Sequence, residues 1–192
     1  MSTGSRKLRA WICDHRGSAA VEFALIGLPF LLTLVAFMES AFDMFCMNAL
    51  DNAVQIAARQ IMTGQIQGAT HQISAAQFNG SVLCPLLPSA FNCANLIVNI
   101  QTFSIGGSSG GFYSFVNSAH SGLKTPSGTS YCLGTGGQYV FVQVLYPMPL
   151  LTTAFLKAAT SYNGQNVLML SSGAAFRNEP FQAPGYNPPA GC

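Results

Sequence analysis

A single apolar segment over residues 21–38 limits what this chain can fold into more than any other part of its sequence. Only Glu22 and Thr33 interrupt it, and about 18 apolar residues are close to the shortest helix that crosses a lipid bilayer. Basic residues beside such a helix stay on its cytoplasmic side, and four precede this segment: Arg6, Lys7, Arg9 and Arg16. The next basic residue is Arg59. The sequence therefore predicts one membrane helix, with the N-terminus in the cytoplasm and everything after about residue 42 outside it.

The composition agrees with a chain that is tethered to a membrane. Charged residues make up 7% of the chain, against about 25% in a typical soluble domain, and hydrophobic residues make up 49%. Four basic and four acidic residues follow the apolar segment. Proteins that bind nucleic acid carry a basic surplus, so we expect no nucleic-acid partner.

The helix is expected to continue beyond the membrane. Between Phe42 and Ile61, apolar residues recur at steps of three and four with polar residues between them, which is typical of a helix that packs one face against a domain. Thr63-Gly64 supplies a stop, because glycine is common just after a helix end. One helix over residues 18–63 would be about 70 Å long, and Pro29 inside it predicts a kink.

Residues 64–192 are predicted to form a small head outside the membrane. Three segments rich in β-branched and aromatic residues are expected to be strands, and Pro147 should end the second of them. Together with the long helix, they predict an α+β fold with an antiparallel sheet of about three or four strands. The expected strands are residues 96–105, 139–146 and 167–176; helices are expected at 73–83 and 150–159, a loop at 106–137 with a short helix near 112–119, and an extended proline-rich tail at 180–189.

Four cysteines fall in the exported part of the chain, where disulfides persist: Cys84, Cys93, Cys132 and Cys192. Three pairings of these cysteines are possible. We favour Cys84 with Cys93, because that bond closes a short loop that contains proline, which leaves Cys132 with Cys192. The alternative is that they are buried free thiols. A metal site is disfavoured, because the spacings contain no Cys-x-x-Cys pair and histidine is scarce.

One short motif raises the possibility of catalysis. Gly106-Gly107-Ser108-Ser109-Gly110 matches the nucleophile elbow of hydrolases and follows an expected strand. That elbow also needs an acid and then a histidine later in the chain. The acid available is Glu179, and no histidine follows it. We therefore expect a flexible loop there, no catalytic residue and no cofactor.

Several other residues have ordinary structural interpretations. His71 and His120 are isolated in the sequence and are expected to be exposed or structural. Glu39 and Asp43 are expected to mark a solvated turn at the outer edge of the membrane. Cys46 is expected to be buried, with an intersubunit disulfide as the alternative.

Glu22 is the residue most in need of an explanation. An acidic side chain at the centre of a membrane helix costs roughly 2.5–3.5 kcal/mol on insertion scales, so it usually has a partner and a function. The alternative is a carboxylate at the membrane interface in contact with water. A conventional signal peptide would need small residues at a cleavage site after the apolar core, and residues 35–41 offer no convincing site.

Three stretches of the sequence form a recognisable set. They are Arg16-Gly17-Ser18-Ala19-Ala20-Val21-Glu22-Phe23-Ala24, then Ala57-Ala58-Arg59 leading to Thr63-Gly64-Gln65, and last Arg177-Asn178-Glu179-Pro180-Phe181. Together they resemble the TadE-like minor pilins, or pseudopilins, of the tight-adherence (Flp) pilus system. The first stretch is the most specific, because it follows a basic leader and joins Gly17 to Glu22-Phe23 and a membrane span. The resemblance covers the helix well and the middle of the chain poorly.

The resemblance implies a pilin-like fold and a processing step. A prepilin peptidase would cleave between Gly17 and Ser18, which makes residues 1–17 a cytoplasmic leader, and Glu22 would pair with the new N-terminal amine of a neighbouring subunit. The implied partners are that peptidase, the major Flp pilin, other minor pilins, the inner-membrane pilus platform and membrane lipid. The protein would be a single-pass inner-membrane protein with a periplasmic head, able to enter the extracellular pilus as a primer or tip subunit.

Two alternatives remain open from the sequence. One is a periplasmic adhesin or binding module on an uncleaved anchor, for which Glu22 would be dispensable. The other is a pseudopilin of a secretion system, which shares the properties of the helix and differs in its partners.

Overall fold

The computed structural model describes residues 18–67, 73–105, 111–119, 123–125, 129–150, 160–181 and 192. The chain divides into two compact units, Met1–Phe42 and Asp43–Cys192. The expected leader, residues 1–17, lies outside the described residues, as do nearly all of the helix expected at 150–159 and most of the tail expected at 180–189.

Helix α2 (Ser18–Met62) matches the helix that the sequence predicted over residues 18–63. It continues through Pro29, and the hydroxyl of Thr33 donates a hydrogen bond to the Pro29 carbonyl at 2.7 Å. Just after its C-terminal end, Gly64 has a φ of 75°. The amide of Gly64 bonds the Ile61 carbonyl and that of Gln65 bonds the Gln60 carbonyl, both at 3.0 Å. These two bonds form a Schellman motif, which satisfies carbonyls that the helix end leaves open.

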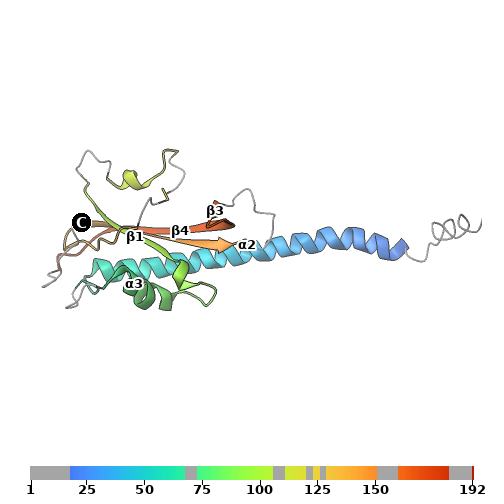
Figure 1. Ribbon diagram of the computed structural model, residues 1–192, viewed down its shortest axis with the longest axis horizontal. Helices are drawn as coiled ribbons and strands as arrows, with labels where there is room; N and C mark the ends of the chain where they lie inside the picture. The colour runs from blue at the N-terminus through green and yellow to red at the C-terminus, as the bar shows by residue number, and fades with distance from the viewer. Residues whose placement is uncertain are drawn as a thin grey trace, which may run out of the picture. The chain divides into compact units, whose positions relative to one another are not determined.

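Four antiparallel strands form one sheet in the order β1-β2-β4-β3 (Figure 1). The central strands β2 and β4 pair over eleven positions, from Tyr139 with Arg177 to Pro149 with Val167. The α+β fold and the size of the sheet are therefore as predicted. The strands are β1 (Ile97–Phe103), β2 (Tyr139–Pro149), β3 (Thr160–Tyr162) and β4 (Gln165–Arg177).

Strand β2 does not end at Pro147, so that expectation is wrong. β1 pairs with β2 only as far as Leu145, and from Tyr146 onward β2 pairs with β4 alone. A proline is tolerated where one edge of a strand needs no donor, which explains why β2 continues to Pro149.

Strand β3 was not expected from the sequence. It forms a hairpin with β4 across Asn163 and Gly164, which have φ values of 50° and 77°. Asn-Gly between two strands favours this tight turn, because both residues accept positive φ. The dipeptide was therefore available as a turn indicator, although the short strand before it has little apolar character.

The core of unit Asp43–Cys192 lies between the C-terminal part of α2 and one face of the sheet. The buried helix residues recur at helical spacing, and β2 contributes alternate residues, as a half-buried strand should. A helical segment after α2, made of α3 (Ala75–Gln77), η2 (Phe78–Leu83) and η3 (Cys84–Leu86), adds two more side chains. The core side chains include Cys46, Leu50, Val54, Ala57 and Ile61 of α2, Phe78 and Leu83 of η2, and Val140, Val142, Val144 and Tyr146 of β2.

The opposite face of the sheet is partly covered by residues between β1 and β2. The short helix η5 (Gly111–Phe115) lies on this side of the sheet (Figure 1). The ring of Phe115 packs on that of Phe141, with centroids 4.5 Å apart, and Phe112 meets Phe141 edge to face at 5.5 Å. These rings hold η5 on strand β2, close to the position where a short helix was expected.

Candidate functional site

The residues of the predicted processing motif lie at the N-terminal end of the described chain. Gly17 lies outside the described residues, and Ser18 is in helix α2. Glu22 follows four residues later, so it is one helical turn from the residue that would become the N-terminus. Its side chain is exposed in the single subunit.

Between residues 19 and 42, most large apolar side chains are exposed. Phe23, for example, is 77% exposed, and exposed apolar surfaces of this extent mark contacts with lipid or other proteins. Among the described residues, α2 is the one helix long and apolar enough to cross a membrane, judged by length and composition. The segment is compatible with a single-pass membrane anchor. Its exposed apolar residues include Val21, Leu25, Ile26, Leu28, Phe30, Leu31, Leu32, Phe37 and Met38.

Two predictions near the middle of α2 have different outcomes. Glu39 was expected in a solvated turn, but its side chain is only 5% exposed, so that expectation is wrong. Sequence spacing alone could not reveal this burial, because the pattern marks a polar residue and not what covers it. Cys46 is buried and unbridged within the core, as the favoured interpretation predicted.

Both disulfides that the sequence favoured are present in the structure. Cys84 in η3 is joined to Cys93 in η4 (Cys93–Asn95), with Cα atoms 5.8 Å apart. Cys132 is joined to Cys192, with Cα atoms 5.4 Å apart. This second disulfide holds Cys192 beside β1, where the Thr102 hydroxyl donates a hydrogen bond to the Cys192 carbonyl at 3.4 Å.

The second and third stretches that carried the family resemblance meet in space. Phe181 lies directly over Gly64, because a Cβ on that glycine would be 2.6 Å from the ring. The amide of Glu179 donates to the Met62 carbonyl at 2.9 Å. The Gln67 and Asn178 side-chain amides both donate to the carbonyl of Leu133, at 3.1 and 3.0 Å. These contacts attach the end of α2 to the end of β4, which indicates a structural role for both stretches.

Replacing Gly64 by alanine should destabilise the head. The left-handed conformation costs a residue with a Cβ about 1–2 kcal/mol, and the new methyl would overlap the Phe181 ring. We expect a lower midpoint in urea unfolding of the full chain in detergent, followed by circular dichroism. Gly80→Ala is a matched control, since a Cβ there meets no atom within 4 Å. Equal midpoints for the two variants would contradict this account of the junction.

The described part of the chain holds no cluster of metal-ligating side chains. Among the described residues, no group of three or more histidine, cysteine or acidic side chains could hold a metal ion. His71, His120 and the Gly106–Gly110 loop lie outside the described residues.

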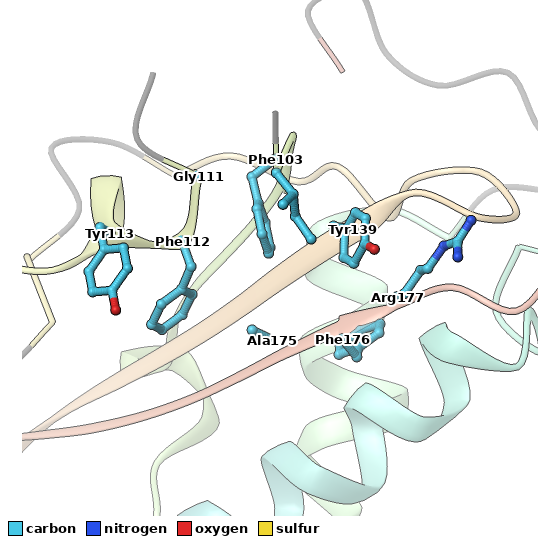
Figure 2. A pocket seen from close by; sticks show the side chains of 9 residues that line it. Phe103, Gly111, Phe112, Tyr113, Tyr139, Ala175, Phe176 and Arg177 are labelled. Atoms are coloured by element: carbon cyan, nitrogen blue, oxygen red, sulfur yellow. The ribbon is translucent and has the colours of Figure 1, made fainter. Parts of the chain in front are cut away.

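An open aromatic hollow on the sheet was missed by the sequence analysis. Phe103, Tyr139 and Arg177 occupy one row across β1, β2 and β4, because each pairs with the next in the strand register. Phe112 and Tyr113 of η5 close the other end of a hollow of about 440 Å³ (Figure 2). These residues are far apart in the chain, so only the pairing of the strands brings them together.

The comparisons with known proteins agree with the N-terminal part of this description. Residues 17–59 match the family model of the TadE-like proteins. Comparison with curated proteins and with solved structures found no match. The family match starts at Gly17, contains Glu22 and runs along α2 nearly to its end, as the resemblance in the sequence predicted. Through residues 17–59 this chain is therefore similar to the TadE-like proteins.

Proposed function

We propose that this protein is a minor pilin that takes part in assembly of a Tad (Flp) pilus after cleavage between Gly17 and Ser18. The family match carries the proposal. It begins at residue 17, beside the peptide bond that would be cleaved, and it contains Glu22. Glu22 then lies one turn inside a helix whose apolar side chains are exposed.

Glu22 would act by pairing with the amine that cleavage produces on a neighbouring subunit. Each charge alone is expensive in a low-dielectric surrounding, and the two attract strongly there. Pairing therefore favours the one register in which carboxylate and amine meet. The exposed apolar side chains beside Glu22 would supply the contact between helices, or between helix and lipid.

The proposed organisation assigns a role to each part of the chain. Residues 1–17 are the cytoplasmic leader, residues 18–63 the membrane and assembly helix, and residues 64–192 the periplasmic head. The basic residues before the helix favour this orientation. The proposed partners are the prepilin peptidase, the major pilin, other minor pilins and the inner-membrane platform, with the head contacting other subunits or a surface.

The mature N-terminus provides the direct test. We expect mass spectrometry of protein from cells with the peptidase to find a chain that starts at Ser18, and protein from cells without it to retain the leader. Gly17→Leu should block the cleavage, because a bulky side chain obstructs access to the peptide bond. Gly27→Ala is a suitable control, since its added methyl would meet the Phe23 ring at an ordinary 3.6 Å.

An intact leader in both strains would refute the proposal and favour a membrane-anchored adhesin. Cleavage alone does not separate a Tad minor pilin from a pseudopilin of a secretion system. Cross-linking from the exposed apolar face of α2 does so. We expect Tad pilus subunits among the linked partners, and exclusive capture of secretion components would contradict the Tad assignment.

A further inference from the structure

Two adjoining hollows on the head form an exposed groove around an aromatic ridge. The first has a volume of about 440 Å³ and the second about 600 Å³, and they share Phe103, Ile105 and Tyr139. Volumes of this size are usual for sites that hold small ligands. The groove also carries exposed apolar surface, because Tyr113 is 73% and Ile105 65% exposed.

The ridge between the hollows consists of two aromatic rings. The centroids of Phe103 and Tyr139 lie 5.7 Å apart with their planes 39° apart. Figure 2 shows Phe103 between Phe112 and Tyr113 at one end of the first hollow and Tyr139 and Arg177 at the other. The face of an aromatic ring is electron-rich, so it attracts the weakly positive C–H groups on one side of a sugar ring.

The first hollow has a cation at its edge. The Arg177 guanidinium lies 5.6 Å from the centre of the Tyr139 ring, and its Nε donates to the Gly137 carbonyl at 2.9 Å. Arginine carries five N–H donors, so four remain after that bond. In the described residues no acidic side chain pairs with Arg177, and after α2 the sequence holds three basic residues against the single acidic Glu179. A planar carboxylate is the natural complement of this fork.

The second hollow has neutral polar side chains: Thr102, Ser104 and Gln138. The side-chain Oε1 of Gln138 accepts a hydrogen bond from the Thr135 backbone N–H at 2.7 Å. The side-chain NH2 of Gln138 is therefore directed elsewhere. Neutral hydroxyl and amide groups beside aromatic rings suit hydroxyl-rich ligands. Among the described residues that line the two hollows, Arg177 is the one cation, which argues against nucleic acid, whose backbone needs several.

We propose that the groove binds an acidic oligosaccharide. One sugar ring lies over the Phe103–Tyr139 ridge with its carboxylate on Arg177, and the next sugar lies in the second hollow against Ser104 and Gln138. The chemistry required is a pyranose that bears a carboxylate, such as a hexuronate, whether it comes from a cell-surface polymer or a free oligosaccharide.

Isothermal titration of the full-length protein in detergent tests the proposal. The probes are an oligogalacturonate of two to four residues, its methyl ester and the single galacturonate. We expect saturable binding of the acidic oligosaccharide, with about tenfold weaker binding of the ester, because a charge-assisted pair is lost. A longer polygalacturonate distinguishes a free oligosaccharide from a cell-surface polymer as the natural ligand. If the long chain and the short oligogalacturonate bind with equal affinity per site, the groove recognises a free acidic oligosaccharide. If the long chain binds more tightly, the groove recognises a polymer.

Three variants relate any binding to the groove. Arg177→Gln should weaken binding about tenfold or more, and Tyr113→Ala, which removes an exposed ring, should weaken it less. Arg59→Gln removes an equal charge from the exposed side of α2, outside both hollows, and should leave the affinity unchanged. No saturable binding, equal binding of acid and ester, or equal loss with Arg59→Gln would overturn the proposal. Binding of an acidic peptide instead, with the same dependence on Arg177, would assign the groove to a protein partner and also overturn it.

Discussion

Substitution of Glu22 by glutamine is expected to reduce strongly the incorporation of this subunit into the proposed pilus while leaving its cleavage intact. Glutamine keeps the size and polarity of the side chain and removes the charge that would pair with a neighbouring amine. A charge-assisted hydrogen bond contributes about 1.5–3 kcal/mol, and each 1.4 kcal/mol changes an equilibrium constant tenfold. We therefore expect at least a tenfold loss of cross-linked subunits, measured by in-cell cross-linking and pilus counts.

The exposure of Glu22 makes this result interpretable. Because its side chain is exposed in the single subunit, the substitution should not unfold the head, and the mature N-terminus should still be Ser18. Asp51→Asn is a matched control, since it removes an exposed carboxylate of the same helix from the polar side beyond the apolar segment. Normal pili and unchanged cross-links with Glu22→Gln would refute the proposed role of this carboxylate.

Loss of the disulfide between Cys132 and Cys192 should destabilise the head more than loss of the disulfide between Cys84 and Cys93. The bond spans 60 residues of sequence and the one between Cys84 and Cys93 spans nine. In the chain-entropy model these closures correspond to about 4 kcal/mol and about 2.5 kcal/mol. We expect the double variant Cys132→Ser/Cys192→Ser to lose correspondingly more stability than Cys84→Ser/Cys93→Ser.

Cys46 offers a built-in measure of this difference. Its thiol is buried in the core, so alkylation of the mature protein must wait for the head to open. If the thiol reacts only in the unfolded chain, the rate of alkylation should rise by a factor of ten for each 1.36 kcal/mol of lost stability. The rise should be about a thousandfold in Cys132→Ser/Cys192→Ser and somewhat under a hundredfold in Cys84→Ser/Cys93→Ser. A larger acceleration when the short loop is opened would contradict the entropic explanation.

The longest element was the easiest to predict from the sequence. An unbroken apolar segment, a helical repeat of apolar residues and a glycine at the stop placed α2 to within one residue of Ser18–Met62. The three longer strands were located for a similar reason, because β-branched and aromatic residues gather there. Their ends were less certain: β2 passes Pro147 only because its β1 edge is already unpaired at that point.

The candidate sites divide in the same way. Gly17, Ser18 and Glu22 form a local motif in the sequence, which the family match also covers. The row of Phe103, Tyr139 and Arg177 has no local pattern, because it depends on the register of three strands. The burial of Glu39 likewise depends on what covers the helix, which no spacing along the helix reveals.

The sequence by itself determined the apolar helix, the α+β class and the favoured pairing of four cysteines, since each follows from neighbouring residues or from simple counting. Only the tertiary structure decided how the strands are ordered, that Phe181 covers Gly64, and that an arginine stands beside an aromatic ridge. The physical reason is that these contacts join residues tens of positions apart. Many alternative pairings satisfy the same hydrophobic pattern, and only the packing of the whole core against α2 selects one of them.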